Sequence, residues 1–208
     1  SGSQVLVYFE ADNQLGSFYI YGAQVEQGSY PTSYIPTSGS AVTRAAETCN
    51  GAGNADTFND SEGVLMAEMS ALADSSDNRV ITISDGTTNN RVQVYLNGSN
   101  GISGGIISGG SGQATLNYSG DTKINTKAAV KYKVNDFSLW VNGFEIATDV
   151  IGSAPLALSE IDFDNGAGSA NFYGKAKGVN AYQTALTDAE LEYLTSYRSL
   201  AEMATELN

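Results

Sequence analysis

The sequence predicts an all-β domain of about ten short strands, closed by one helix near the C-terminus. Segments that alternate apolar and polar residues recur from residue 63 to residue 182, at the spacing typical of a sandwich or a barrel. The chain has 23 Gly and only 16% charged residues, which indicates many turns between short strands. At 208 residues it is long enough for one such domain and a smaller piece beside it.

Residues 1–40 differ in pattern from the rest of the chain. The segments QVLVYFE and SFYIYGAQVE, joined by a turn at Asp12-Asn13, predict a β-hairpin. Pro31 and Pro36 favour extended conformations in the residues before them, which indicates a semi-rigid linker. An isolated hairpin is marginally stable in water. We therefore interpret residues 1–40 as the end of a preceding module or stalk, and residues 41–208 as the main domain.

The main domain opens with a polar segment, residues 43–62, which predicts a long surface loop or an irregular first strand. The segments that follow have the two-residue period of half-buried strands. Two of them show it most clearly: GVLMAEMSAL, with Leu65, Ala67, Met69 and Ala71 on one face, and NRVQVYLN, with Val92, Val94 and Leu96 pointing inward.

Three further features predict details of the later strands. The Gly/Ser tract of residues 97–112 has an apolar centre at Ile106-Ile107, which predicts a weak strand between loops. The segment KAAVKYKV predicts a half-buried strand whose lysines form a solvated basic face. Asn142-Gly143 predicts a two-residue hairpin turn, because both residues tolerate the positive φ of a type I′ turn.

The helix signal follows the last predicted strand. Thr187 and Glu190 have the spacing of a capping box, in which each side chain satisfies a backbone N–H of the other residue. Leu186 and Leu191 have the spacing of a hydrophobic staple across the same helix start. We predict a C-terminal helix over residues 187–205 that packs against the sheet assembly.

Charge and residue counts exclude several classes of function. The formal charge of −13, with ten Lys and Arg in all, argues against nucleic acid and anionic membranes as partners. No apolar run approaches the roughly 18 residues that span a bilayer, and no signal-peptide pattern is present. The chain has no His and a single Cys, Cys49. This excludes Ser-His and Cys-His nucleophiles, His- or Cys-based zinc sites and an intrachain disulfide.

The order of these segments resembles a known family. The W-x-N-G hairpin of residues 140–143 and the closing unit YQTALTDAEL of residues 182–191 are similar to elements of the laminin-G-like, concanavalin-A-like lectin domains found in phage tail-fibre and other virion proteins. The resemblance covers residues 43–195. It implies a two-sheet antiparallel concanavalin-A-like sandwich, or jelly roll, that presents loops to a glycan or host cell-surface polysaccharide. It also implies a place on the virion or outside the cell, after an upstream fibre or stalk module and often within a homotrimer.

The segment Glu160-Ile-Asp-Phe-Asp164 resembles the E-x-D-x-E strand of retaining glucanases of the laminarinase and agarase group, which share this fold. Retaining chemistry needs its two carboxyl groups about 5 Å apart. The last acid of this chain, Asp164, is one methylene shorter than the Glu of those enzymes, and only 44 residues follow the motif. We interpret the three acids as an outward acidic row and the domain as non-catalytic.

Calcium is the one cofactor that the acidic residues suggest. Asp162 and Asp164 lead into a Gly-rich loop, and Asp74 and Asp77 lie in another loop. Carboxylates on loops are calcium ligands. The segment that starts at Asp162 resembles the beginning of an EF-hand loop, but it has Tyr173 at the position where that loop needs a bidentate Glu. The alternative is that all four acids are simply solvated.

Aromatic and amide side chains are candidates for glycan contacts, since sugar sites combine both. Trp140 and Tyr95 are out of phase with the inward residues of their strands. Asn89, Asn100 and Asn165 lie in Asn/Gly/Ser loops, where binding residues often gather. For the two aromatic residues, the alternative is packing on the other face of a sheet or beneath the helix.

Four hypotheses for function remain. The first is a non-catalytic receptor-binding domain of a phage tail fibre that recognises a host glycan. The second is an accessory carbohydrate-binding module of a secreted polysaccharide-degrading enzyme or an adhesin. The third is a glycanase that uses Glu160 and Asp164. The fourth is a purely structural virion domain without a ligand.

Overall fold

The computed structural model describes residues 34–36, 38–40, 42 and 51–197. The chain divides into two units, Ser1–Ala45 and Ala46–Asn208. The predicted hairpin lies outside the described residues, and the described residues of the predicted linker form neither strand nor helix. All the described strands and the one described helix belong to the second unit, and no described helix has the length and apolar character needed to cross a membrane.

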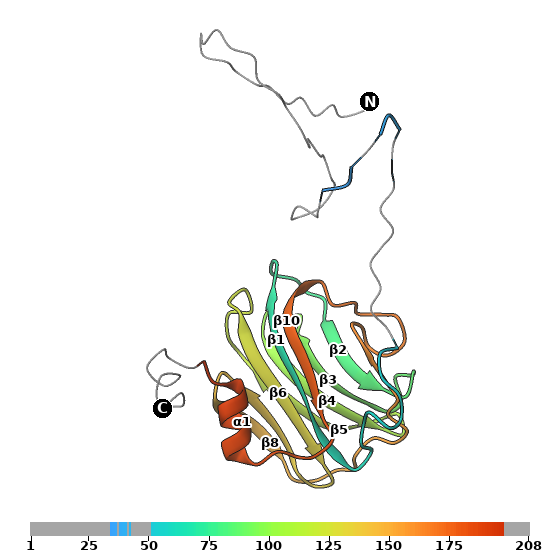
Figure 1. Ribbon diagram of the computed structural model, residues 1–208. Coiled ribbons are helices and arrows are strands. Elements are labelled where there is room, and N and C mark those ends of the chain that lie inside the picture. The colour runs from blue at the N-terminus through green and yellow to red at the C-terminus, as the bar shows by residue number, and fades with distance from the viewer. Residues whose placement is uncertain (1–33, 37, 41, 43–50, 198–208) are drawn as a thin grey trace, which may run out of the picture. The chain divides into compact units, whose positions relative to one another are not determined.

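The described part of the second unit is a two-layer β-sandwich with one helix (Figure 1). Its elements are β1 Glu62–Ala71, β2 Arg79–Ser84, β3 Arg91–Leu96, β4 Ile102–Ser108, β5 Ser111–Tyr118, β6 Thr126–Lys133, β7 Phe137–Val141, β8 Phe144–Asp149, β9 Glu160–Asp162, β10 Gly174–Tyr182 and α1 Asp188–Thr195. The first sheet has the order β10-β1-β6-β7-β8, and the second sheet has the order β5-β4-β3-β2-β9. Neighbouring strands are antiparallel, which confirms the predicted all-β, two-sheet fold.

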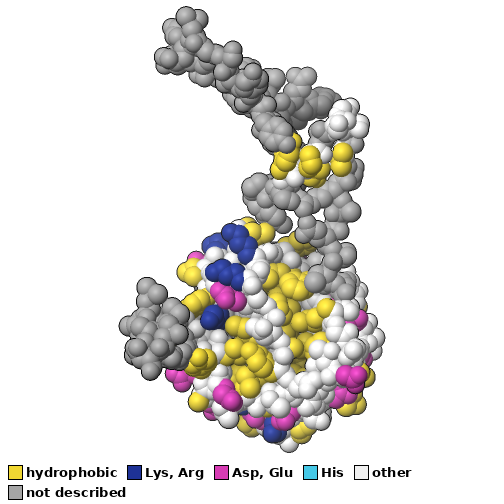
Figure 2. Space-filling model, in the orientation of Figure 1, with side chains coloured by type: hydrophobic (Ala, Val, Ile, Leu, Met, Phe, Trp, Pro, Cys, Tyr) yellow, Lys and Arg dark blue, Asp and Glu magenta, His cyan; other side chains and the backbone are white. Residues whose placement is uncertain are grey.

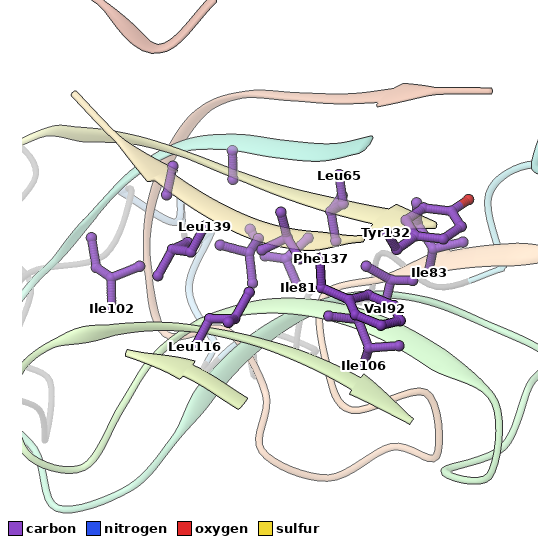
Figure 3. Packing of buried hydrophobic residues seen from close by; sticks show 14 of the residues in the cluster. Leu65, Ile81, Ile83, Val92, Ile102, Ile106, Leu116, Tyr132, Phe137 and Leu139 are labelled. Atoms are coloured by element: carbon purple, nitrogen blue, oxygen red, sulfur yellow. The ribbon is translucent and has the colours of Figure 1, made fainter. Parts of the chain in front are cut away.

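The core lies between the two sheets. Alternate residues of each strand point into it, and the predicted inward residues of β1 and β3 are all buried there. In Figure 3, Leu65 and Tyr132 of the first sheet face Ile83 and Val92 of the second. At Gly104 the sheets approach closely, since a Cβ there would lie 2.7 Å from a methyl group of Val130. The same alternation turns the remaining residues of each strand outward.

Helix α1 packs on the outer face of the first sheet. Leu191 of the helix forms a second apolar cluster with Val64, Met66, Ala129 and Trp140. The predicted capping box is confirmed: the Thr187 N–H donates to Glu190 Oε2 at 2.8 Å, and the Glu190 N–H donates to Thr187 Oγ1 at 3.4 Å.

The end of the helix differs from the prediction of residues 187–205. The helix ends at Thr195, because Ser196 is extended with φ −67° and ψ 148°. Residues 198–205 lie outside the described part of the chain. The two residues that follow the helix are tied to the first sheet, where Lys127 Nζ donates to the Ser196 carbonyl and the Tyr197 hydroxyl donates to the Asn125 carbonyl.

The Asn-Gly turn is confirmed, because Asn142 has φ 51° and Gly143 has φ 88°. Two other expectations need correction. The weak strand around residues 106–107 is a full strand, β4, with a neighbour on each side. Lys131 is not on a solvated face: it is 8% exposed, because helix α1 covers this part of the sheet, and its ammonium pairs with Asp136 at 2.8 Å. Asp188, at the start of the helix, lies 3.8 Å from the same ammonium.

Candidate functional site

The two sheets have different outer faces. The outer face of the first sheet carries the helix and the apolar cluster beneath it, and Figure 2 shows apolar side chains beside the helix and Lys and Arg side chains gathered at one end. The second sheet turns polar residues outward from β3, β4 and β5. We call these residues the polar face: Arg91, Gln93, Tyr95, Ser103, Gly105, Thr115 and Asn117.

The strand register arranges the polar face in rows across the sheet. Tyr95 is paired with Ser103, which is paired in turn with Asn117. The next row consists of Gln93, Gly105 and Thr115. Neighbouring strands lie about 4.8 Å apart, so the side chains of one row are close enough to contact one sugar ring together.

Small residues on β4 let the longer side chains of β3 lie flat on the sheet. A Cβ at Gly105 would lie 2.6 Å from Gln93 Nε2, so the Gln93 side chain lies across this glycine. Neither the Gln93 amide nor the Tyr95 hydroxyl has a hydrogen-bond partner among residues 51–197, and both side chains are partly exposed. They are therefore available to a ligand.

Arg91 is the cation of the polar face. Its Nη1 donates to the Asn165 carbonyl at 2.9 Å, whereas its Nε is buried and has no partner in the described residues. Burial lowers the pKa of Arg91, and nearby Tyr95 opposes this effect. The ordinary pKa of Arg lies so far above neutral pH that the guanidinium stays charged. It is held in place at Nη1, and its Nη2, which has no hydrogen-bond partner in the described residues and unlike Nε is not fully buried, is the donor left for an anionic or polar group.

The β2 part of the outer face is covered. Val80 and Thr82 point outward but are 3% and 0% exposed. The loop that follows β9 lies against this strand: the Val80 N–H donates to the Ala170 carbonyl at 3.0 Å, and a Cβ at Gly166 would lie 2.7 Å from Ser84 Oγ. The accessible part of the face is therefore β3–β5.

Tyr95 and Trp140, the two aromatic candidates from the sequence, have different surroundings. Tyr95 lies on the polar face and is partly exposed. Trp140 is 6% exposed beneath helix α1, and its indole N–H donates to Ser138 Oγ at 3.1 Å. This is the packing alternative, and it leaves the Trp140 ring without an open face for a sugar.

The three candidate asparagines do not form one group. Asn89 and Asn165 lie in loops next to the start of β3, and Asn100 lies beyond its other end. The Asn165 side chain accepts from the N–H groups of Ala167 and Ser169, so it shapes its own loop. The Asn100 side chain accepts from the Ser75 N–H and so links its loop to the loop between β1 and β2. Asn89 is exposed, and its backbone carbonyl accepts from the Gly110 N–H.

The acids of the glucanase-like motif lie at the edge of the second sheet. Asp162 and Asp164 are 3% and 2% exposed. Asp162 Oδ1 accepts from the Gly51 N–H and Asp164 Oδ1 accepts from the Gly166 N–H, both at 2.6 Å. Burial and, to a lesser degree, the neighbouring carboxylates raise the pKa of Glu160 and of Asp162. The expected outward row is thus largely covered, and Asp164 is not accessible as the acid of a glycanase.

Three of the four acids proposed for calcium have other partners for their carboxylates, and the fourth, Asp77, interacts electrostatically with Arg79. Asp74 forms an ion pair with Lys123 at 2.8 Å, and the Asp77 N–H donates to Ser75 Oγ within the same loop. Asp162 accepts from the Gly51 N–H, before β1, and Asp164 accepts from the Gly166 N–H, in the loop after β9. In the described part of the chain, no three acidic, His or Cys side chains come together in a way that could hold a metal ion.

Sequence reasoning missed Arg91, Gln93 and Asn117. The signal was present, because residues 91 and 93 alternate with Val92 and Val94 just as Tyr95 does. The sequence does not show which outer face of the sandwich the helix covers. That choice depends on contacts between α1 and strands far away in the chain.

Comparison with known proteins gives the fold. No family model and no curated protein matches the sequence. Among solved structures, the chain is similar to the CBM40 module of the Ruminococcus gnavus IT-sialidase bound to α2,3-sialyllactose, with 16% identity, a TM-score of 0.58 and coverage of 73% of this chain and 97% of that module. Another structure of this module is bound to α2,6-sialyllactose, with 17% identity and a TM-score of 0.56.

Two other neighbours have the same sandwich. The NanB sialidase from Streptococcus pneumoniae matches over 69% of this chain and 25% of that enzyme, with 13% identity and a TM-score of 0.57. A heptameric SAP-like pentraxin from Limulus polyphemus matches over 73% of this chain and 76% of that chain, with 9% identity and a TM-score of 0.54. The second unit therefore has the jelly-roll β-sandwich fold.

Proposed function

We propose that this chain contains a non-catalytic carbohydrate-binding module whose ligand lies on the polar face. The observation that carries the proposal is that the outward Tyr95 hydroxyl and Gln93 amide of β3 have no hydrogen-bond partner within residues 51–197 and share this face with the guanidinium of Arg91. Sugar sites combine an aromatic surface with a few fixed polar groups. The shared fold of the CBM40 modules bound to sialyllactose supports this choice.

An acidic glycan is the ligand that we propose to test first. Arg91 retains donors on a molecule with a formal charge of −13, so it offers a local cation to a carboxylate that the rest of the surface repels. The neighbours with sialyllactose support sialylated glycans as the first class of probe. We propose no metal for this site, because the carboxylates of Asp74, Asp162 and Asp164 already have other partners.

We further propose that the domain acts outside the cell as an accessory module of a glycan-degrading enzyme or an adhesin. The sialidase modules among the structural neighbours support this hypothesis over the tail-fibre hypothesis. Genomic context separates the two. Genes for polysaccharide use next to this one would favour the accessory module, and tail or capsid genes would favour the fibre and its trimer.

The test is a glycan array that contains sialylated glycans, their desialylated forms and neutral polysaccharides. The domain is expected to bind a defined set, and Arg91→Gln is expected to weaken binding to acidic members about tenfold, as for the loss of one charged hydrogen bond. A folded wild-type protein that binds no glycan would contradict the proposal. It would favour the structural domain instead.

A further inference from the structure

Asn117 lies at the outer end of a chain of three hydrogen-bonded side chains on the second sheet. Asn97 Nδ2 donates to Ser103 Oγ at 2.9 Å, and the Ser103 hydroxyl donates to Asn117 Oδ1 at 2.8 Å. Ser103 is fully buried, whereas Asn117 is exposed on the edge strand β5. We call these three residues the amide relay.

The donor-to-acceptor direction of the hydrogen bonds in the amide relay is determined by Asn97. Its Oδ1 accepts from the backbone N–H groups of Ser99 and Gly101, both at 2.9 Å. A backbone N–H can only donate, so the oxygen of the Asn97 amide must face these two groups. The nitrogen of the amide must then face Ser103. Asn97 is therefore the donor to the Ser103 hydroxyl.

The Ser103 hydroxyl in turn determines the orientation of the Asn117 amide. Its oxygen accepts from Asn97, and its proton needs an acceptor because an unpaired buried hydroxyl is costly. Asn117 Oδ1 is that acceptor. The nitrogen of the Asn117 amide is left on the side away from Ser103, and within the described residues neither of its N–H groups has a partner.

We propose that Asn117 is a specificity residue of the polar face, which donates hydrogen bonds to a glycan oxygen that carries no proton. The strongest acceptors of this kind in a glycan are the oxygens of a carboxylate and of an acetamido carbonyl, which accept better than ring or glycosidic oxygens. This inference rests on the proposed function of the polar face. Tyr95 is in the same cross-strand row as Asn117, so the aromatic ring and the amide donor stand on either side of Ser103. Asn97 and Ser103 act as positioning residues.

Asn117→Asp tests the donor role. Aspartate keeps an oxygen for the Ser103 hydroxyl but has no N–H, and its shape is nearly unchanged. If the glycan oxygen that contacts residue 117 carries no proton, the affinity of this variant for the best glycan of the array is expected to fall at least about tenfold in isothermal titration calorimetry. A ligand hydroxyl would instead donate to the aspartate. Binding within about twofold of wild type would therefore overturn the inference.

Two further variants keep this test decisive. Asn180→Asp makes the same change of charge at an exposed asparagine on the outer face of the first sheet, and its affinity is expected to equal that of wild type. Asn117→Ala removes the donor without adding charge, so it replaces Asn117→Asp if that variant does not fold. If wild type itself binds no glycan, the proposed function fails. If wild type and Asn117→Asp bind equally, the function stands and this inference fails.

Ser103→Ala tests the positioning role. Without the hydroxyl, the Asn117 amide is free to turn, so affinity is expected to fall about threefold in the wild-type background and to stay unchanged in an Asn117→Ala background. The melting temperature is expected to fall less in the Asn117→Ala background, because the Ser103 hydroxyl has already lost its acceptor there. An equal loss of affinity in both backgrounds would show that Ser103 acts on stability alone and would overturn its positioning role.

Discussion

Polar side chains on the second sheet differ in whether the protein itself satisfies them. Asn165 accepts from backbone N–H groups of its own loop and Asn100 accepts from the Ser75 N–H of a neighbouring loop, whereas Tyr95 and Gln93 have no partner in the described residues. All three residue types, Asn, Tyr and Gln, are common in sugar sites, so residue type alone does not separate these four residues. The hydrogen-bond partners do, because a group that already shapes a loop is not available to a ligand.

Tyr95→Ala tests the aromatic part of the polar face. The loss of stacking surface is expected to weaken glycan binding about tenfold or more, while the melting temperature changes little because the ring is partly exposed. Tyr173→Ala, at a residue 60% exposed just before β10, is the control and is expected to bind as wild type does. Equal binding by all three proteins in calorimetry would remove Tyr95 from the site.

Glu160→Gln tests the acidic edge of the second sheet. Burial first, and then Asp162, Asp164 and Asp85, raise the pKa of Glu160 in the folded protein. The folded protein therefore binds this proton more readily than the unfolded chain, so stability rises as pH falls through the raised pKa, and the gain is complete below the ordinary pKa of Glu near 4.3.

At pH 7 the Glu160→Gln variant is expected to melt about 1–2 °C higher than wild type and to show a smaller rise in stability between pH 7 and pH 4. Glu145→Gln, at an exposed residue of β8 in the other sheet, is the control for a simple reduction of net charge. Melting curves recorded across this pH range check the prediction. An equal effect of both variants would assign the gain to net charge.

At the scale of single elements, short-range patterns were enough to predict most of the fold. The alternation in β1 and β3, the Asn142-Gly143 turn and the capping box of α1 all depend on residues within a few positions of each other. The end of the helix could not be predicted in this way. Ser196 and Tyr197 leave the helix because Lys127 and Asn125, about 70 positions earlier, hold them on the first sheet.

Thr187→Ala tests the contribution of the capping box. Loss of the cap is expected to cost about 1 kcal/mol and to lower the melting temperature by about 2–4 °C. Thr184→Ala, at an exposed residue three positions earlier, removes a hydroxyl that makes no hydrogen bond in the described structure. It is expected to leave the melting temperature unchanged. Equal melting of the two variants would show that the cap contributes nothing.

Gly104→Ala tests the close approach of the two sheets. A Cβ at this position would lie 2.7 Å and 3.3 Å from the two methyl groups of Val130, which cannot move away in a packed core. The expected cost is about 1–3 kcal/mol of unfolding free energy. Gly178→Ala on β10 meets nothing within 4 Å and is expected to be neutral. Chemical denaturation of both variants checks this, and equal stabilities would contradict the packing described.

At the scale of the whole molecule, the sandwich provides two outer faces and uses them differently. Helix α1 and the cluster around Trp140 occupy one face, which leaves the polar face of the other sheet for a partner. The sequence predicted both sheets, but Trp140 and Tyr95 looked alike in it, since each is out of phase with its inward neighbours. Asn117 was missed because its orientation depends on Asn97 and Ser103, on other segments of the chain.

Removal of calcium tests whether a bound metal contributes to the stability or the glycan affinity of the domain. Asp162 and Asp164 accept from backbone N–H groups, and Asp74 pairs with Lys123, so their carboxylates already have partners. A chelator is therefore expected to leave both the melting temperature and the glycan affinity unchanged. A fall in either quantity that added calcium restores would contradict this and assign the acidic loops to a metal.

The most direct test of the central claim is an NMR titration of the domain with the best glycan of the array. Backbone amide signals are expected to shift along β3, β4 and β5, with side-chain shifts for Tyr95, Gln93 and Asn117, while the signals of α1 and of the outer face of the first sheet stay in place. Shifts confined to the helix side, or no shifts at glycan concentrations that saturate the array, would contradict the claim.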